Sequence, residues 1–264
     1  MTTFFSGKEF AAKKEIELKN KVEDLKTKSV NPKLVSILVG NNVGSTLYTR
    51  LKKEAAEKIG VIFEVYNLSA KISVDDLIKR IQGFNLDKNV HGIMLQMPLP
   101  EILKASTEVI VNSVDVAKDV DGLRTDSKFL HPTSKAIFES IQEFSHDINL
   151  TCVVVGASGM VGTPLVAKLK QSGYSVVECN SKTLDLKGET LKADILVSAT
   201  GKPNIITAEM VKDGVAIIDV GYPVGDVSIE AKNKAKFATP VPGGIGPVTI
   251  TCLLENLIEG CYNT

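Results

Sequence analysis

The fold is decided by residues 152–169, CVVVGASGMVGTPLVAKL, in which a short apolar strand leads into a glycine-rich turn and then into an amphipathic helix. Gly156, Gly159 and Gly162 let the backbone turn sharply and come close to a ligand. The N-terminus of the following helix offers unpaired N–H groups to a phosphate. Residues 174–179 form a second apolar strand at the spacing of a dinucleotide-binding fold. The stretch predicts a Rossmann-like parallel sheet.

The glycine motif by itself leaves an alternative open. Ser158 takes the place of the second glycine in G-x-G-x-x-G, and any βα turn of a parallel sheet can carry such glycines. Two more apolar strands, residues 195–199 and 215–220, are each followed by a glycine, Gly201 and Gly221. Because the carboxyl ends of parallel strands share one edge of the sheet, glycines there leave room for a dinucleotide.

Composition excludes several classes of partner. The 264 residues, 44% of them apolar, can fill two α/β lobes. Lys and Arg number 31 and so do Asp and Glu, so no field of one sign attracts nucleic acid or an anionic membrane. The sequence has no long apolar run, no C-x-x-C pair and no metal-binding histidine pattern. We expect a cytoplasmic protein with a small-molecule ligand, no membrane or nucleic-acid partner and no metal.

A lysine lies among apolar residues in the first half of the chain. After the apolar strand of residues 34–39, helical periodicity to Ile59 places Lys52 in one arc with Leu47, Tyr48, Leu51, Ala55, Ala56 and Ile59. One interpretation is a lysine that snorkels from the rim of the apolar stripe. The other is a desolvated ammonium whose pKa is lowered, as general acid–base catalysis requires, with Tyr48 one turn away in the same cavity.

Two polar residues lie at element ends in the same half. Gln96 interrupts the apolar strand 91–97 at its carboxyl end, where it can contact a ligand or cap backbone groups beside the proline turn. Asp115, Asp119 and Asp121 are spaced like a calcium loop but lack its bidentate glutamate. We expect instead that a turn at Asp121-Gly122 points one carboxylate at the N–H groups of a ligand.

The order of elements predicts two lobes of α/β class. Residues 1–145 form the first, residues 146–249 the Rossmann-like second, and residues 250–264 a helix that packs back on the first lobe. Residues 146–149 are the expected hinge. The stretch 239–249, TPVPGGIGPVT, predicts a stiff loop because it holds three prolines and three glycines.

Six segments resemble one enzyme family in sequence and in order: VGNNVGSTLYTRLKKEAAEKIG, GIMLQMPLP, KDVDG, VVVGASGMVG, DVGY and TPVPGGIGPVT. The family is that of the bifunctional methylenetetrahydrofolate dehydrogenase/methenyltetrahydrofolate cyclohydrolases, and the likeness covers residues 39–256. The resemblance implies a cleft between a folate-binding lobe and a dinucleotide-binding lobe. It also implies oxidation of methylene- to methenyl-tetrahydrofolate, hydrolysis to the formyl form, and a homodimer.

The resemblance assigns roles to individual residues. Lys52 matches the catalytic lysine, Tyr48 the tyrosine that packs on the pterin, Gln96 the glutamine bonded to the lysine, and Asp121 the aspartate that holds the pterin. Further expected folate contacts are Pro242, Gly243 and Gly244. The expected dinucleotide contacts are Gly156, Ala157, Ser158, Val161, Ser181, Lys182, Gly201 and Tyr222.

Three departures from the family pattern stand out. Ala157 replaces a usual arginine, residues 131–136, HPTSKA, replace P-C-T-P-x-G, and Asn180 replaces a common histidine. Because the last arginine is Arg124, the second lobe has no guanidinium fork for a 2′-phosphate.

The choice between NADP and NAD therefore depends on other residues. Ser181 and Lys182 follow the second strand, where a lysine can meet phosphate as a point charge. Glu178 lies near the place of the acid typical of NAD sites. We expect NADP, with NAD as the alternative. Two other functions stay open: a Rossmann dehydrogenase of a small hydroxy or amino acid, and a non-catalytic nucleotide sensor.

Overall fold

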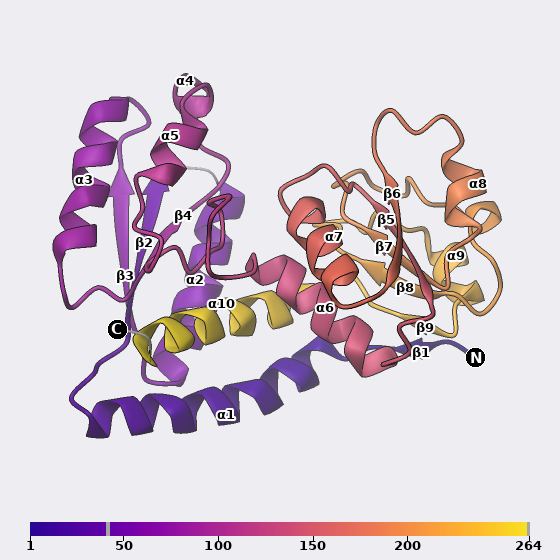
Figure 1. The fold of residues 1–264 in the computed structure, drawn as a ribbon, viewed down its shortest axis with the longest axis horizontal. Coiled ribbons are helices and arrows are strands. Elements are labelled where there is room, and N and C mark those ends of the chain that lie inside the picture. Colours follow the sequence, from indigo (N-terminus) through magenta and orange to yellow (C-terminus); the bar gives the residue numbers. More distant parts are fainter. Residues whose placement is uncertain (41–42, 263–264) are drawn as a thin grey trace. The chain divides into compact units, whose positions relative to one another are not determined.

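The chain divides into two compact α/β units, each with its own parallel sheet (Figure 1). The computed structural model describes residues 1–40 and 43–262, and the side chains of residues 43–46 are not described. The N-terminal unit comprises residues 13–132 and 250–264, and the C-terminal unit comprises residues 1–12 and 133–249. In the described residues no helix has the length and apolar content needed to span a bilayer.

The N-terminal unit is built on a three-stranded sheet in the order β3-β2-β4, with every pairing parallel. Its strands are β2 (Lys33–Val39), β3 (Ile62–Leu68) and β4 (Gly92–Leu95). Its helices are α2 (Val43–Lys58), α3 (Val74–Leu86), α4 (Glu101–Lys104) and α5 (Thr107–Asn112), together with most of α1 (Gly7–Thr27) and α10 (Ile245–Tyr262).

Alternate residues of the central strand β2 enter two separate cores. Leu34 packs with Met94 of β4 and with apolar residues of α1, α2 and α10. Val35 and Ile37 point the other way and pack with residues of α3 and α5. The sheet is therefore buried on both faces, which explains the nearly continuous apolar run of β2.

The C-terminal unit is built on a six-stranded parallel sheet in the order β1-β9-β8-β7-β5-β6. Its strands are β1 (Thr3–Phe4), β5 (Thr151–Val155), β6 (Ser175–Cys179), β7 (Ile195–Ser198), β8 (Ala216–Asp219) and β9 (Phe237–Ala238). Its helices are α6 (Pro132–Phe144), α7 (Gly162–Gln171), α8 (Leu186–Thr190), α9 (Ile229–Lys234) and the 3-10 turn Ala208–Met210.

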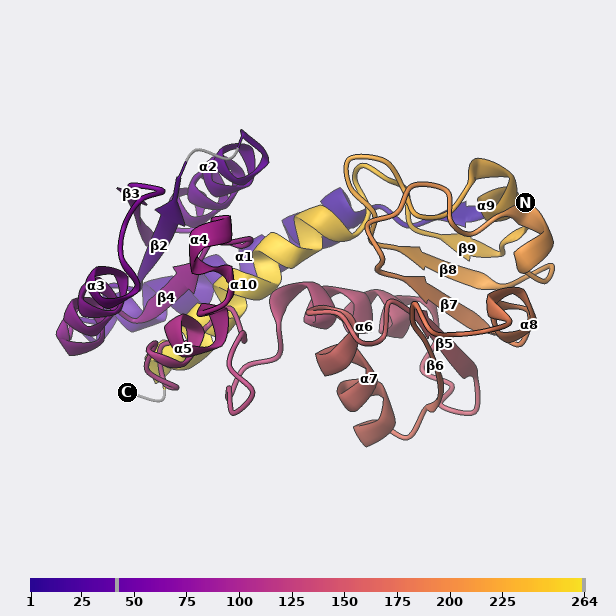
Figure 2. The same cartoon turned by 90° about the horizontal axis from the view of Figure 1, so that it is seen from above.

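Helices cover both faces of this sheet. Both views place α6 and α7 on one side of the strands and α8 and α9 on the other (Figure 2). Val153, Leu196 and Ile217 share a core with Ala231 and Ala235 of the α9 segment. The prediction of two parallel α/β lobes, the second Rossmann-like, is confirmed.

The unit boundaries differ from the expected ones at two segments. Residues 1–12 belong to the C-terminal unit because β1 pairs with β9, with Thr3 opposite Phe237. Residues 133–145 also belong there, since the Phe144 ring lies 5.2 Å from that of Phe237. The change of unit therefore falls at Pro132–Thr133 and not at residues 146–149.

Two predicted elements also have different bounds. The last helix, α10, begins at Ile245, so the proline- and glycine-rich stretch 239–249 is a loop only in its first part. Strand β4 ends at Leu95, so Gln96 directly follows the strand.

Candidate active site and dinucleotide-binding turn

Helix α2 carries Lys52 at the point where the helix leaves the core. Ala56 and Ile59 are fully buried in the core beneath the sheet, whereas Leu47 and Leu51 are 37% and 38% exposed. The apolar arc expected for this helix is thus only partly buried, because just its C-terminal half packs on the sheet. Lys52 is half-buried between the two parts, and Tyr48 is half-buried one turn earlier.

The Lys52 amine has two uncharged hydrogen-bond partners. Its Nζ atom is 3.2 Å from Sδ of Met94 and 3.4 Å from Oε1 of Gln96. Burial lowers the pKa of Lys52, and the carboxylate of Asp121 opposes this shift in part. A lowered pKa raises the fraction of neutral amine at a given pH, and the neutral amine is the form that can accept a proton.

Gln96 is positioned by the sheet and by its own neighbour. Its N–H donates to the carbonyl of Ile37 at 2.9 Å, which continues the ladder between β2 and β4. Its side-chain Nε2 donates to the carbonyl of Met97 at 3.2 Å. These two bonds leave Oε1 directed at Lys52. The position of Gln96 directly after β4 therefore determines the contact between its oxygen and the Lys52 amine.

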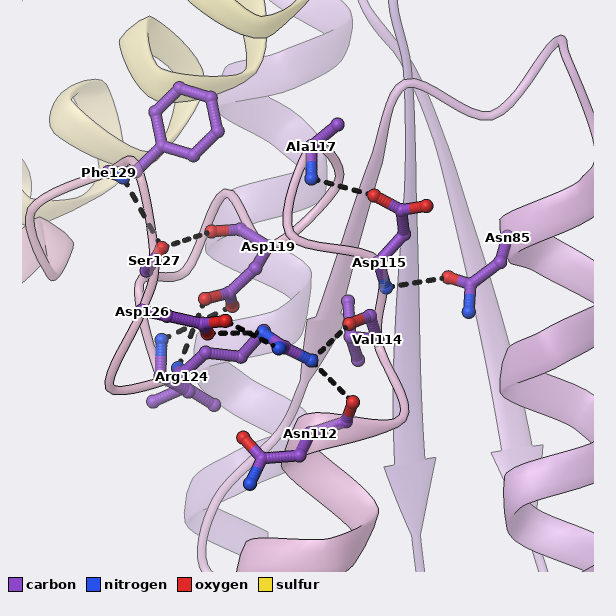
Figure 3. A network of polar contacts seen from close by, with 11 residues as sticks. Asn85, Asn112, Val114, Asp115, Ala117, Asp119, Arg124, Asp126, Ser127 and Phe129 are labelled. Carbon is purple, nitrogen blue, oxygen red and sulfur yellow. Dashed lines mark hydrogen bonds and ion pairs between the residues drawn. The ribbon is translucent and has the colours of Figure 1, made fainter.

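Two side chains, Asp119 and Arg124, hold the loop of residues 119–126 (Figure 3), and Asp121 lies within this stretch of the chain. Asp119 is buried and accepts the N–H groups of Leu123 and Arg124 at 3.2 and 3.0 Å. The Arg124 guanidinium donates to Asp126 and to the carbonyls of Val114 and Asn112. Asp119 and Arg124 therefore fix the loop and leave Asp121 half-buried between Val120 and Gly122.

The structure adds His131 to this group of residues. Its side chain is 9% exposed, and within the described residues its Nδ1 atom has no hydrogen-bond partner. Burial lowers the pKa of His131; Asp121 acts in the opposite direction and Lys52 in the same direction. The imidazole therefore shares the electrostatic environment of Lys52 and Asp121.

One buried amide holds the segments that carry Asp121 and His131. Nδ2 of Asn256, a residue of α10, donates to the carbonyls of Val120 at 2.9 Å and Leu130 at 3.0 Å. The two segments also touch, because a Cβ added at Gly122 would lie 2.8 Å from the backbone nitrogen of His131. The structure thus brings Lys52, Gln96, Asp121 and His131 together in the N-terminal unit.

Sequence reasoning missed His131 although a signal was present. The residue opens the HPTSKA segment that departs from the family pattern. Spacing along the chain could not connect it to Lys52, which lies far away in sequence. Only the packing of residues 120–122 against residues 130–131 reveals the relationship.

The glycine turn of the C-terminal unit is packed too closely for side chains. Gly156 has φ +91°, and a Cβ there would lie 2.5 Å from the carbonyl oxygen of Ala199. A Cβ at Gly162 would lie 2.1 Å from the carbonyl oxygen of Gly156. These contacts bring the start of α7 against the turn after β5, the arrangement that exposes helix N–H groups to a pyrophosphate. The residues present fit a dinucleotide.

The expected dinucleotide contacts gather at one edge of this sheet. The turn Gly156–Val161 follows β5, Ser181 and Lys182 follow β6, Gly201 follows β7, and Tyr222 follows β8. These strands are neighbours in the order β8-β7-β5-β6, and the chain changes direction across the sheet at β5. Parallel sheets bind ligands at such a switch point.

Residues 180–183 form a turn that displays Ser181 and Lys182. Asn180 Oδ1 accepts the N–H of Lys182 at 2.9 Å, and the Asn180 N–H donates to Thr183 Oγ1 at 2.9 Å. Both displayed side chains are exposed. This gives Asn180 a structural role that the sequence left uninterpreted. Glu178 is exposed and forms an ion pair with Lys170 at 2.6 Å.

The structure also shows the surroundings of Ala157 and of the segment 242–244, two parts of the expected ligand sites. Ala157 is 4% exposed, so its methyl group points into the protein where the family usually has an arginine. Pro242, Gly243 and Gly244 lie in the C-terminal unit, with Gly243 at φ +100° and its Cβ position open. They are therefore not in the same unit as Lys52.

Comparisons with known proteins match the whole chain. Residues 5–121 match the catalytic domain of the tetrahydrofolate dehydrogenase/cyclohydrolases, and residues 131–264 match their NAD(P)-binding domain. This chain belongs to the tetrahydrofolate dehydrogenase/cyclohydrolase family. It is an enzyme of folate one-carbon metabolism with methylenetetrahydrofolate dehydrogenase and methenyltetrahydrofolate cyclohydrolase activities, as the resemblance predicted.

Individual family members are similar over nearly their full length. The bifunctional protein FolD of Nautilia profundicola is 38% identical over 279 aligned positions, which cover 99% of this chain and 98% of that protein. The crystal structure of the bifunctional FolD enzyme of Campylobacter jejuni is 36% identical with a TM-score of 0.94, and covers 100% of this chain and 99% of that one.

A third relative was crystallised with a cofactor. The Trypanosoma brucei FolD structure, complexed with NADP and an inhibitor, is 28% identical with a TM-score of 0.93 and covers 99% of this chain and 98% of that one. Family membership excludes the two alternative functions, a dehydrogenase of another substrate class and a non-catalytic nucleotide sensor.

Proposed function

We propose that Lys52, Gln96, Asp121 and Tyr48 form the folate site in which both reactions occur. Asp121 accepts hydrogen bonds from the pterin N–H groups, and Tyr48 packs against the pterin ring. Lys52 moves protons, and Gln96 orients its amine. The observation that carries this proposal is the lowered pKa of Lys52, a half-buried lysine 3.4 Å from an amide oxygen and influenced by Asp121.

The hydrolysis step makes the clearest use of Lys52. Water adds to the methenyl carbon of the cationic folate, and the neutral amine of Lys52 accepts the proton that the water loses. The ring then opens as the carbon–nitrogen bond breaks: the leaving nitrogen takes the proton back from Lys52, the hydroxyl proton of the adduct is released to solvent, and the formyl group stays on the other nitrogen. The oxygen of Gln96 stabilises the ammonium during this exchange without holding it permanently charged.

The oxidation step depends on the C-terminal unit. The bound dinucleotide supplies an acceptor for the hydride that leaves the methylene carbon of the folate. The turn at Gly156, Ala157, Ser158 and Val161 would hold the pyrophosphate through its backbone, and Gly201 and Tyr222 would lie beside the nicotinamide. Pro242, Gly243 and Gly244 would contact the folate.

We further propose that the dinucleotide is NADP. Lys182 and Ser181 are displayed on the turn after β6, where a 2′-phosphate would lie. Glu178, which could instead bind a free ribose hydroxyl, is engaged by Lys170. The NADP complex of the Trypanosoma brucei relative points to the same cofactor. A single lysine lacks the fork geometry of arginine, so the selectivity should be modest.

The test is to measure both reactions in the wild type and in Lys52→Met. Reduction of NADP in the presence of methylenetetrahydrofolate reports oxidation, and loss of methenyltetrahydrofolate absorbance reports hydrolysis. We expect hydrolysis to fall by about 100-fold or more, the usual contribution of a general base. Lys53→Met is the matched control, because Lys53 is exposed and pairs only with Glu57 at 3.7 Å among the contacts described. Wild-type hydrolysis in Lys52→Met would overturn the assignment.

Two broader expectations belong to the same proposal. We propose that the enzyme is a homodimer, as the family resemblance implies, and that it acts in the cytoplasm on a free folate without a membrane or nucleic-acid partner. Sedimentation tests the first: a species near the 28.4 kDa chain mass at all concentrations would contradict a dimer. Cell fractionation tests the second.

A further inference from the structure

A buried carboxylate holds together the strand ends of the C-terminal unit. Asp226 is 0% exposed, and its Oδ2 atom accepts three hydrogen bonds. The donors are Ser198 Oγ at 3.0 Å, Thr200 N at 2.6 Å and Thr200 Oγ1 at 2.8 Å. Ser198 ends β7 and Thr200 lies in the loop after it, so Asp226 holds the carboxyl end of this strand in place.

The same residue is tied to the next strand. The Asp226 N–H donates to Oδ1 of Asp219 at 2.9 Å, and Asp219 is the last residue of β8. Asp219 also accepts the N–H of Gly221 at 2.9 Å and forms a buried ion pair with Lys232 at 2.7 Å. Asp226 therefore joins the loop after β7 to the loop after β8.

A third strand end rests on the first of these loops. The Gly156 Cα lies so close to Ala199 that an added Cβ would be 2.5 Å from the Ala199 oxygen. Thr200 also holds the next residues of the loop after β7. Its Oγ1 accepts the N–H of Lys202 at 3.1 Å, and this bond spans Gly201, which has φ +65°. Asp226 thus holds the ends of β7 and β8, and the turn after β5 packs against Ala199, the residue between Ser198 and Thr200.

We infer that Asp226 is a positioning residue for the dinucleotide: it fixes the loops after β7 and β8, which carry Gly201 and Tyr222, in the shape that receives the nicotinamide half. This inference rests on the proposed function of those strand ends. Without the carboxylate, Ser198 Oγ and the Thr200 N–H lose their buried acceptor, and the loop after β7 loses its fixed place. Cofactor binding should weaken while the residues of the N-terminal unit are unaffected.

The experiment compares Asp226→Leu and Asp226→Asn with the wild type. Binding of NADP is measured directly by calorimetry, and cyclohydrolase activity is measured without cofactor. We expect about 10-fold weaker NADP binding or more in Asp226→Leu, from the loss of buried hydrogen bonds. Asp226→Asn keeps an oxygen acceptor and should lose less. Cyclohydrolase activity should stay within about twofold in both, since loss of only the cofactor contacts leaves proton transfer by Lys52 intact.

Asp194 supplies a matched control in the same unit. It accepts the N–H of Thr151 at 2.9 Å and pairs with Lys212 at 2.6 Å, but it lies at the amino end of β7. Asp194→Ala should lower thermal stability and leave NADP affinity unchanged. If Asp226→Leu does not fold, the NADP affinities of Asp226→Asn and Thr200→Val are compared with those of the wild type and Asp194→Ala in its place.

Two results would overturn the inference. One is wild-type NADP affinity in a folded Asp226→Leu variant. The other is a loss of affinity in Asp194→Ala that matches the loss in the Asp226 variants at equal stability, which would mean that Asp226 only supports the fold. Wild-type protein that lacks both activities would instead overturn the proposed function, so the two failures are distinguishable.

Discussion

The Nζ atom of Lys52 lies 3.4 Å from Oε1 of Gln96, and Gln96 Nε2 donates to the carbonyl of Met97, which turns the oxygen toward the amine. The neighbour of the lysine is therefore a neutral acceptor. A carboxylate in this place would favour the ammonium by direct charge attraction and would counter the effect of burial. An amide orients the amine and leaves it able to lose its proton.

This relationship predicts the effect of Gln96→Glu. The new carboxylate should raise the pKa of Lys52, so that the neutral amine forms only at higher pH. We expect cyclohydrolase activity at neutral pH to fall. The rise of the rate with pH, which follows formation of the neutral amine, should occur at higher pH than in the wild type. Rate profiles of both proteins between pH 6 and pH 10 test this, with Gln96→Leu as the uncharged control. Superimposable profiles for Gln96→Glu and wild type would contradict the proposed pairing.

Asp121 should matter for folate and not for the dinucleotide. In the proposed site, Asp121→Ala deprives the pterin N–H groups of their acceptor, at a cost of about 1–3 kcal/mol. We expect folate KM to rise accordingly, while direct binding of NADP changes little. Asp75→Ala, at an exposed position in the first turn of α3, is the control. Equal losses for both ligands would show that Asp121 supports the fold and does not contact the folate.

Lys182 should set the preference between NADP and NAD. Its side chain is exposed on the turn held by Asn180, so Lys182→Ala removes a charge and leaves the turn intact. We expect the ratio of kcat/KM for NADP to that for NAD to fall by about 5-fold or more, the effect of one ionic hydrogen bond. Lys187→Ala, an exposed lysine of α8, is the control. An unchanged ratio, or a wild-type preference for NAD, would refute the assignment.

His131 should make the stability of the protein depend on pH. Burial lowers its pKa from 6.5 in the folded state, so below that pH the unfolded chain binds a proton that the folded protein does not. Above pH 6.5 the imidazole is neutral in both states, so its contribution to the free energy of unfolding is fully present. As the pH falls toward the folded-state pKa, the unfolded chain binds the proton first and the free energy of unfolding decreases. Urea unfolding of wild type and His131→Gln across this range measures the difference. We expect the variant to lose less stability on acidification, and equal losses would show that His131 does not titrate as its burial implies.

The sequence alone determined the fold class, the family and most of the proposed site. Apolar strands followed by glycines predict a parallel sheet because each strand must be buried on both faces and each turn must come close to its neighbours. The position of Lys52 among apolar residues indicated a shifted pKa, and the direction found agrees. Such local signals are readable because periodicity and backbone freedom act over only a few residues.

Tertiary structure alone decided which distant residues meet. His131 and Asp121 share an environment because Asn256 of the last helix holds both segments, a relationship that no spacing in the chain reveals. The place of Asp226 between two strand ends likewise depends on contacts across the sheet. Leu47 and Leu51 belong to the apolar arc of α2 but are exposed, because only the C-terminal half of the helix joins the core cluster. Burial and partner choice depend on contacts between segments far apart in the chain, and these the sequence pattern does not contain.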